Sequence, residues 1–534
     1  MKRILILLCY LLLSQGCSEA EAPLPAQVDF NFHVKPILSD RCFKCHGPDD
    51  NTREAGLRFD TKAGAFAAID SAGTQYAIIP GNPAQSKLVE RIHHQDPDER
   101  MPPPDANLPL TSYEKRLLEQ WIAQGAEWKQ HWSLIPPEKP TSPEVENSAW
   151  PQNAIDAFIL ARIEQQGFEP APAASREKWI RRVFFDLTGL PPTLSAIDNF
   201  LSDDAPDAFE KVVDSLLASS AFGERMAVEW LDLARYADTQ GHHHDFERNM
   251  WPWRDWVVEA FNKNMPYDQF VTWQLAGDLL PNATYAQKLA TAFNRNHKIT
   301  QECGVIEEEF RVEYVVDRTN TFSTAFLGLT MACAQCHDHK YDPLSQKEYY
   351  ELFSFFNNVP ERGRWPHAEK TAASPNLPLP EAQLAETQKY IADLLERRDT
   401  LSTPLEDDFG TWEAELNALT YPVMVMAEMD TLRPAYVLAR GVYDARQERV
   451  YPNTPAQILP FSDDLPANRL GLAQWLFEDN HPLTARVAIN RYWQLIFGAG
   501  IVRTPQDFGS QGALPTHPAL LDWLAVSFQE SGWD

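Results

Sequence analysis

Apolar residues recur at helical spacing along most of the chain. Residues three or four positions apart lie on one face of a helix, so each such stripe predicts an amphipathic helix packed on a core. The stripes are Phe30, Val34, Ile37 and Leu38; Leu117, Leu118, Trp121 and Ile122; Ile155, Phe158, Ile159 and Ile163; Trp179, Ile180, Val183 and Phe184; and Leu384, Ile391, Leu394 and Leu395. We therefore predict a mainly α fold.

Residues 421–460 break this pattern, because VMVMAE and AYVLAR are rich in Val and aromatic residues and read as strands. Proline-rich and polar stretches suggest where the segments divide. The predicted segments are a signal peptide at 1–16, a tether at 17–28, a compact domain at 29–129, a Pro-rich linker at 130–152, a helical domain at 153–359, a linker with an amphipathic helix at 360–420, a β-rich segment at 421–462, and a helical domain that starts at 463–534 and is expected to continue beyond it.

The N-terminus has the pattern of an export signal. Lys2 and Arg3 precede the apolar run Ile4 to Leu13, which is too short to span a bilayer. The run ends in LSQGC and resembles a bacterial lipoprotein cleavage box, although Ser14 stands where Leu is usual. We expect an exported protein of the periplasm or cell envelope, anchored to the membrane by a lipid on Cys17, with plain secretion as the alternative.

The chain is strongly acidic. Its 534 residues contain 47 Lys and Arg against 75 Asp and Glu, a formal charge of −28. Nucleic-acid binding relies on Lys and Arg to neutralise phosphates, so this balance argues against a nucleic-acid partner. A basic redox partner would be steered toward such a surface, although acidity also simply favours solubility.

Two CxxCH motifs carry the chemistry of the sequence. In the first, Cys42 and Cys45 are one helical turn apart, so both sulfurs can reach the vinyl groups of one haem. His46 then follows as an axial ligand of the iron. This predicts covalent haem c on Cys42 and Cys45; a zinc knuckle or a thiol-redox pair is the alternative.

A c-type haem with one His needs a second axial ligand from later in the chain. Met101 stands in RMPPP, where three prolines predict an extended loop that can present the thioether to iron. A helix follows, opened by a capping box at Thr111 to Glu114. Helix, CxxCH, Met loop, closing helix is the order of a class I-like cytochrome c. His33, His93 and His94 are alternative ligands.

Long motifs resemble a known family. FHVKPILSDRCFKCHG, PGNPAQSKLVERI and DPDERMPPP are similar to the planctomycete-type cytochrome c domain. NAIDAFILARIEQQG, EEFRVEYVVDR and LTMACAQCHDHKYDPLSQKEYY resemble the associated second domain, and the stretch beginning NRLGLAQWLF resembles the start of the third. The resemblance implies haem roles for Cys42, Cys45, His46 and Met101. Because the later domains have no known biochemical function, it implies an architecture rather than a reaction.

The second motif is Cys333 to His337. It predicts a second covalent haem on Cys333 and Cys336 with His337 as axial ligand, although no MPP loop follows. We expect His297 as the distal ligand, with the run 242–244 as second choice. The alternative is a structural metal site formed by Cys333, Cys336, His337 and His339.

The sequence contains no nucleophile elbow, phosphate loop or HExxH motif, so we name no catalytic residue. Charged groups such as Asp232, Arg235, Tyr236 and Asp238, at helical spacing, and Glu307 to Arg311, opening a helix, are expected to be structural ion pairs.

The predicted architecture is an N-terminal class I-like cytochrome c domain, a larger helical domain, a short β-containing segment and the start of a further helical domain. We favour electron transfer with an unidentified redox partner protein. A haem-dependent oxidoreductase with a catalytic second domain and an envelope scaffold with accessory haem are the alternatives.

Overall fold

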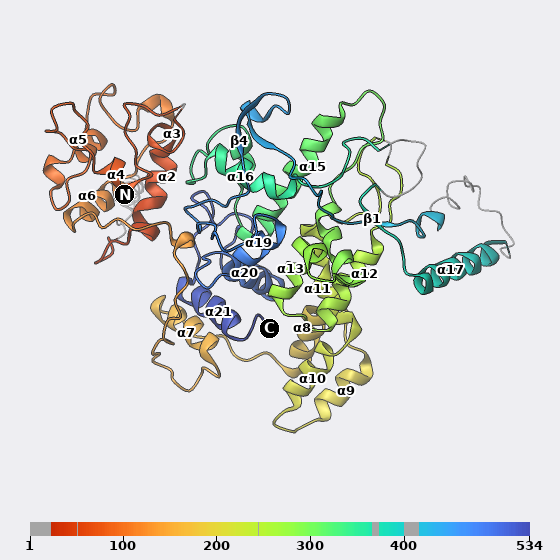
Figure 1. Ribbon diagram of the computed structural model, residues 1–534. Helices are drawn as coiled ribbons and strands as arrows, with labels where there is room; N and C mark the ends of the chain where they lie inside the picture. The colour runs from red at the N-terminus through yellow and green to blue at the C-terminus, as the bar shows by residue number, and fades with distance from the viewer. Residues whose placement is uncertain (1–22, 51, 244, 366–372, 400–415) are drawn as a thin grey trace, which may run out of the picture. The chain divides into compact units, whose positions relative to one another are not determined.

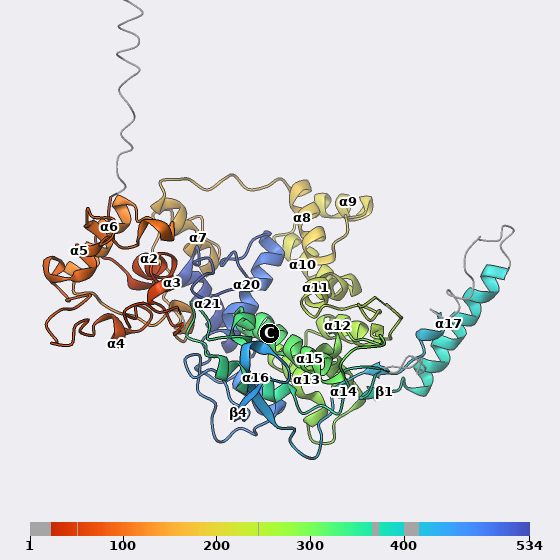
Figure 2. The ribbon, with the colours of Figure 1, turned by 90° about the horizontal axis from the view of Figure 1, so that it is seen from above.

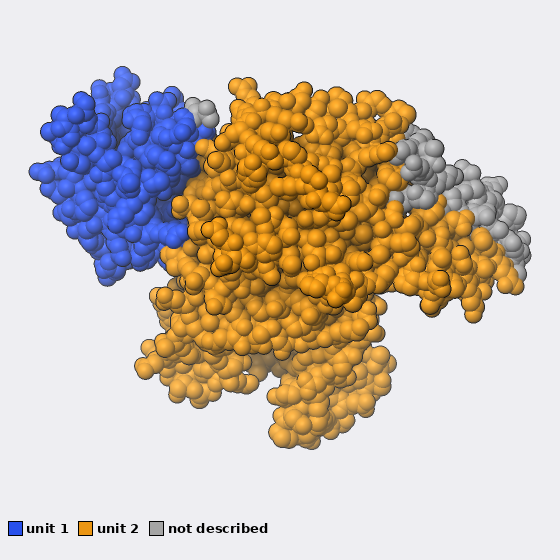
Figure 3. Space-filling view, viewed as in Figure 1, with its two compact units in different colours: residues 1–132 blue, residues 133–534 orange. Residues whose placement is uncertain are grey.

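The computed structural model describes residues 23–50, 52–243, 245–365, 373–399 and 416–534. The predicted signal peptide and Cys17 lie outside these ranges, as does His244 of the histidine run. The chain divides into two compact units, residues 1–132 and residues 133–534, which Figure 3 colours separately. As predicted, the described residues are mainly helical (Figures 1 and 2). Within those ranges, no helix combines the length and apolar content that crossing a bilayer requires.

The first unit is built from short helices around one apolar core. Its first helical stretch is continuous in space, because a π-helical turn, η1, leads directly into α2 and then α3. The helices are η1 (Phe30–Val34), α2 (Lys35–Arg41), α3 (Phe43–His46), α4 (Lys62–Ala65), η2 (Pro83–Gln85), α5 (Lys87–His93), η3 (Pro104–Ala106) and α6 (Ser112–Ala123). All four apolar residues of the first predicted stripe are buried.

The closing helix α6 matches its prediction closely. Thr111 accepts a hydrogen bond from the Glu114 backbone N–H, and the Glu114 side chain accepts one from the Thr111 N–H, which completes the capping box. The residues Leu117, Leu118, Trp121 and Ile122 are buried as predicted. Because Trp121 lies against Phe30, with ring centroids 5.7 Å apart, the first and last helices of the unit share one core.

The second unit packs further helices around an aromatic core. Trp230 lies between Phe270, Phe293 and Phe326, and its indole N–H donates to the buried Gln274 amide. The main helices are α7 (Ala154–Gln165), α8 (Arg176–Thr188), α9 (Leu194–Ser202), α10 (Ala208–Leu217), α11 (Ser220–Leu233), α12 (Trp251–Asn262), α13 (Tyr267–Ala276), α14 (Tyr285–Ala290), α15 (Glu307–Phe322), α16 (Gln346–Phe356), α17 (Glu381–Asp399), α19 (Arg469–Trp475), α20 (Thr484–Phe497) and α21 (Pro518–Glu530). Short turns η5 (Gly277–Leu279), η6 (Thr291–Arg295), η7 (Ser323–Leu327) and η8 (Met331–Gln335) connect them.

The strands are few and short. Within the described residues, β1 (Asn376–Leu377) pairs antiparallel with β2 (Val423–Met424), and β3 (Ala435–Leu438) pairs antiparallel with β4 (Arg446–Val450). VMVMAE therefore supplies only a two-residue strand, whereas AYVLAR supplies β3. The hairpin of β3 and β4 packs on α16, next to the second CxxCH motif.

The sequence divides residues 153–534 into several segments, but the structure folds residues 133–534 as one compact unit. A buried ion pair illustrates why. Arg469, on α19, donates to both carboxylate oxygens of Asp278 at 2.8 and 2.7 Å, and its guanidinium lies 3.4 Å from Glu428. Three distant stretches of sequence are thereby joined in the interior.

Candidate functional site

The first CxxCH motif lies on a single helical turn. The N–H of His46 donates to the carbonyl oxygen of Cys42 at 2.8 Å, and that of Cys45 donates to the same oxygen at 3.1 Å. This turn places both sulfurs and the imidazole within one short segment, α3 and its preceding residue Cys42. Covalent attachment of haem to two cysteines depends on this local spacing.

A return segment that the sequence did not reveal covers this turn. The N–H of Glu54 donates to the Cys45 carbonyl, and the N–H of Phe59 donates to the His46 carbonyl, both at 2.8 Å. The Phe59 ring meets the His46 imidazole edge to face at 5.7 Å. The only sequence signal for this contact is the apolar pair Leu57 and Phe59 within a polar stretch.

A cavity of about 290 Å³ brings the predicted haem residues of the first unit together. Cys42, Cys45, His46 and Met101 all line it, although Met101 is 55 residues from His46 in sequence. Its other walls are mostly apolar, from Leu57, Phe59, Ile69, Ala77, Leu88, Ile92, Leu108, Leu110 and Leu118. Two thiols, an imidazole and a thioether around one apolar cavity fit the donor set of haem c.

The His46 ring has the character of a neutral ligand. Its Nδ1 atom is buried and has no hydrogen-bond partner among the described residues, and burial lowers the pKa of the imidazole. A neutral ring offers the lone pair that iron requires. Burial also raises the pKa of the Cys42 thiol to about 12, which disfavours the free thiolate of a thiol-redox pair.

The alternative ligands of the first unit are engaged elsewhere. His33 Nδ1 accepts a hydrogen bond from the Asp29 N–H at 2.9 Å. His93 is paired with Glu119, and His94 lies 3.5 Å from the Asp96 carbonyl oxygen. Met101 is therefore the better candidate for the second axial ligand.

The charge around the cavity differs from that of the whole chain. Among the described residues, the lining includes Arg41, Lys44, Lys87 and Arg91 and no carboxylate. Arg41, Lys87 and Arg91 are paired with Glu114, Glu90 and Glu99, which lie outside the lining. Cationic side chains therefore gather at the rim of this cavity in a protein of net charge −28, although three of the four are paired.

The second CxxCH motif is on the surface of the second unit. Cys333, Cys336 and His337 are exposed, and both cysteines are free thiols. The motif begins within η8 and continues past its end, and its carbonyl at Gln335 accepts hydrogen bonds from the Tyr350 hydroxyl and the Gln346 amide, both at 2.9 Å. The segment is thus held firmly on α16 while its ligating groups face outward.

His297 lies in a buried polar network. Its Nε2 atom is 2.8 Å from the Arg318 guanidinium, its Nδ1 atom is 2.8 Å from the Lys298 carbonyl oxygen, and its ring stacks on Tyr314 at 4.6 Å. Burial lowers the pKa of the imidazole well below its ordinary value, so the ring is neutral. Binding an iron would require His297 to give up one of these hydrogen bonds, and its role as distal ligand stays a prediction.

The other histidines proposed as ligands near the second motif do not gather with its cysteines into a metal-binding group. His339 is buried, and its Nδ1 accepts from the Asp342 N–H at 2.9 Å. His242 packs edge to face on Phe310, 5.6 Å away. In the described part of the chain, no three His, Cys, Asp or Glu side chains gather as a metal-binding group. The four residues of the alternative metal site therefore do not form one here.

Arg235, Glu308 and Arg311 of the charged clusters form ion pairs, as expected. Arg235 pairs with Asp317, and Arg311 makes a two-point pair with Glu308 at 2.8 and 2.9 Å. The helical spacing predicted across residues 232–238 is wrong, because α11 ends at Leu233 and Arg235 has a positive φ of 57°. This turn directs Arg235 toward α15.

Three family models match consecutive parts of the chain. Residues 42–105 match the model described as planctomycete cytochrome C, residues 154–361 match a protein of unknown function (DUF1549), and residues 468–534 match a second one (DUF1553). Neither a curated protein nor a solved structure matches the chain. The predicted family order is thereby confirmed, and the first match suggests a haem-binding cytochrome.

Proposed function

We propose that this chain, with the domain order of planctomycete-type cytochromes, is an exported electron-transfer protein that carries covalent haem c on Cys42 and Cys45. His46 and Met101 would be the axial ligands. The observation that supports this most directly is that all four residues line one apolar cavity. Haem bound there would supply one-electron chemistry, and a Met/His pair raises its potential relative to two histidines.

Occupied axial positions favour a carrier over an enzyme, because substrate then has no place at the iron. The cationic rim formed by Arg41, Lys44, Lys87 and Arg91 favours a redox partner with an acidic docking face, since opposite charges steer encounter. The overall negative charge alone suggests the reverse. Because the rim is nearer to the proposed electron-transfer site than the rest of the surface, we expect the partner to present an acidic face.

The test is haem staining of the denatured full chain, matured with haem-attachment machinery, together with its optical spectrum. Cys42→Ala/Cys45→Ala should remove covalent haem from the first unit, and Met101→Leu should keep the haem but open a position to carbon monoxide. Cys303→Ser is the matched control, because Cys303 is an exposed thiol outside both motifs. Haem released by acid–acetone from the unmodified chain would contradict the proposal.

A second function, haem-dependent oxidoreductase chemistry in the second unit, is favoured by one observation. Cys333, Cys336 and His337 are exposed, while both ring nitrogens of His297 are engaged. A haem attached there would have His337 on one side and an accessible position on the other. A pyridine haemochrome count of two per chain, reduced to one by Cys333→Ala/Cys336→Ala, with rapid cyanide binding, would support this function.

We also propose that the protein is exported, because haem c is attached outside the cytoplasm. The lipid anchor proposed on Cys17 rests on the resemblance of LSQGC to a lipoprotein cleavage box. Cys17→Ala should shift the protein from the membrane fraction to the soluble periplasmic fraction. A wild-type protein found only in the soluble fraction would instead support plain secretion.

A further inference from the structure

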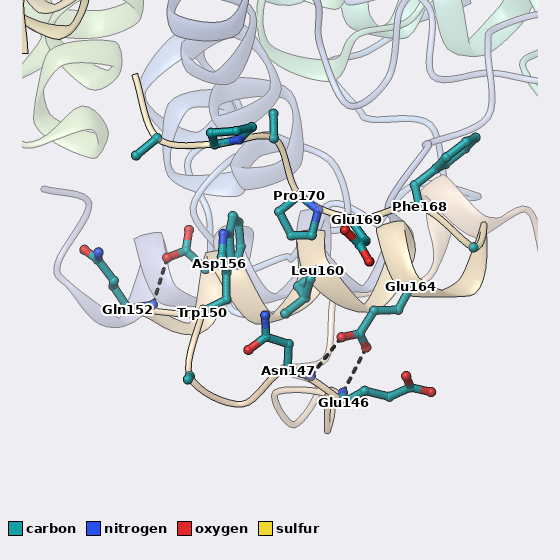
Figure 4. A pocket seen from close by; sticks show the side chains of 15 residues that line it. Glu146, Asn147, Trp150, Gln152, Asp156, Leu160, Glu164, Phe168, Glu169 and Pro170 are labelled. Carbon is teal, nitrogen blue, oxygen red and sulfur yellow. Dashed lines mark hydrogen bonds between the residues drawn. The ribbon is translucent and has the colours of Figure 1, made fainter. Parts of the chain in front are cut away.

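A groove of about 990 Å³ lies along α7 in the second unit, apart from both CxxCH motifs in sequence (Figure 4). Asp156, Leu160 and Glu164 are four residues apart, so they form one stripe on the helix face that lines the groove. Leu160 is fully buried at its floor. The two carboxylates are separated by about 12 Å along the helix axis, from eight residues at 1.5 Å each.

One wall of the groove is residues 146–152, and hydrogen bonds hold it to the same two carboxylates. The Glu164 side chain accepts from the backbone N–H groups of Glu146 and Asn147, both at 3.0 Å, and Asp156 accepts from the Gln152 N–H at 2.9 Å. Figure 4 shows these hydrogen bonds of Glu164 and Asp156 as dashed lines. The wall is therefore preorganised, which lowers the entropic cost of binding.

The opposite wall is residues 167–173, which contain two prolines. Pro170 and Leu160 lie near Trp150, and Glu169 stands beside Pro170 (Figure 4). Trp150 is 37% exposed, so a large aromatic surface faces the groove. The groove thus combines an apolar middle with acidic groups toward its ends.

The charge of the groove selects the class of ligand. Among the described residues, four carboxylates, Glu146, Asp156, Glu164 and Glu169, line it, and no Lys, Arg or His does. Backbone N–H groups partly compensate Asp156 and Glu164, but the groove keeps a net negative charge that a neutral or anionic ligand would not balance. An organic cation gains Coulomb attraction from the carboxylates and a cation–π contact from the indole.

We propose that this groove binds a linear polyamine, an aliphatic chain with an ammonium group at each end. Its methylene segments would lie on Trp150 and Pro170, which line the groove, while its ammonium groups would reach the acidic groups at the two ends. A compact inorganic cation would balance the carboxylates but would make no contact with the apolar middle of the groove. The proposal does not depend on haem.

The test is isothermal titration calorimetry of the full, matured chain with spermidine at low ionic strength. We expect one site per chain. Glu169→Gln and Trp150→Ala should each weaken it roughly fivefold, the size of a single charge or cation–π contact at a partly exposed position. Glu169 is exposed, so this variant should fold normally.

Two matched variants exclude general attraction to an acidic protein. Glu210→Gln removes an exposed carboxylate from α10, and Tyr390→Ala removes an aromatic ring that is 57% exposed on α17; both should leave spermidine binding unchanged. Equal binding by all four variants would overturn the proposal. So would full displacement of spermidine by Mg²⁺ at matched charge, because that marks nonspecific counterion binding.

Discussion

The backbone N–H of Met101 donates to the carbonyl oxygen of Arg91 at 3.0 Å. The Arg91 guanidinium in turn donates to the Glu99 carbonyl oxygen at 3.0 Å and pairs with the Glu99 carboxylate. Arg91 therefore binds the loop in two ways: its backbone carbonyl accepts from Met101, and its side chain binds Glu99. Because Arg91 lies on α5, this holds the start of the Met loop against a fixed helix.

Arg91→Ala should loosen the predicted iron ligand without releasing the haem. The backbone bond remains, but the side-chain bonds to residue 99 are lost. Arg91 and Glu99 are 40% and 50% exposed, so these bonds contribute about 1 kcal/mol or less. We expect the equilibrium constant for methionine ligation to fall by up to about fivefold, seen as a weaker methionine–iron(III) charge-transfer band, with a lower reduction potential.

Lys62→Ala is the control, since Lys62 is an exposed cation on α4 of the same unit. Haem staining should be equal in both variants and in the unmodified chain. If the charge-transfer band is present in the unmodified protein and unchanged in Arg91→Ala, the loop does not depend on Arg91. If it is absent from the unmodified protein, the ligand itself is wrongly assigned.

Glu361 should be required for the stability of the second unit. Its carboxylate accepts two hydrogen bonds from Arg318 at 2.6 and 2.5 Å and lies 3.2 Å from Arg295, all with at most 2% exposed side chains. Glu361→Gln leaves two buried arginines without their counter-charge. We expect a loss of about 3–5 kcal/mol in the free energy of unfolding, measured by urea denaturation.

Glu259→Gln is the matched comparison, because Glu259 forms an exposed i, i+4 pair with Lys263 at 2.5 Å. Exposed pairs contribute little, so this variant should be close to the unmodified protein. Equal effects of the two substitutions would show that the interior network is not stabilising.

Local sequence signals predicted the secondary structure around the first CxxCH motif. The CxxCH turn, the stripe of α6 and its capping box at Thr111 each depend on residues within a few positions of one another. The amphipathic helix predicted from the stripe between Leu384 and Leu395 is likewise present as α17, from Glu381 to Asp399. Such features follow from helix geometry alone and need no knowledge of the fold.

Contacts between residues far apart in the chain could not be predicted from the sequence. Nothing local indicates that residues 54–59 fold back on His46, or that His297 meets Arg318 and Glu361 in the interior. Arg235 was placed on a helix because its spacing is helical, yet the chain turns there into the left-handed region. In this conformation Arg235 pairs with Asp317, a long-range contact that no periodicity reveals.

The close approach of the β3–β4 hairpin to the second motif can be tested at Gly441. This glycine has a φ of 73°, and an added Cβ would lie 3.0 Å from the Cys336 sulfur. Gly441→Ala should therefore lose about 1 kcal/mol from backbone strain and a further amount from the contact.

Gly498→Ala provides the comparison. Gly498 has a nearly equal φ of 77°, but no atom lies within 4 Å of the position that an alanine methyl group would take, so only the backbone strain applies. The difference between the two unfolding free energies measures the contact with Cys336. No difference would mean that the hairpin moves aside freely.

Buried neutral histidines should make the second unit sensitive to acid. His481 is buried, its Nδ1 accepts a hydrogen bond from the Thr484 hydroxyl at 2.9 Å, and burial lowers the pKa of its ring from 6.5 to about 3. Below about pH 6.5 the unfolded chain binds a proton that the folded ring does not, so stability is present above that pH and is lost as the pH falls toward about 3.

At pH 5 this loss amounts to about 2 kcal/mol for one histidine, from 1.36 kcal/mol per pKa unit. His481→Asn retains a side-chain acceptor for the N–H of Thr484 but has no titrating ring. Its free energy of unfolding should therefore fall less steeply between pH 7 and pH 5 than that of the unmodified protein, as measured by urea denaturation at each pH. Parallel pH profiles would show that His481 is protonated in the folded state, and the slope would then arise from other groups with lowered pKa values, such as His297, whose ring is buried beside two arginines.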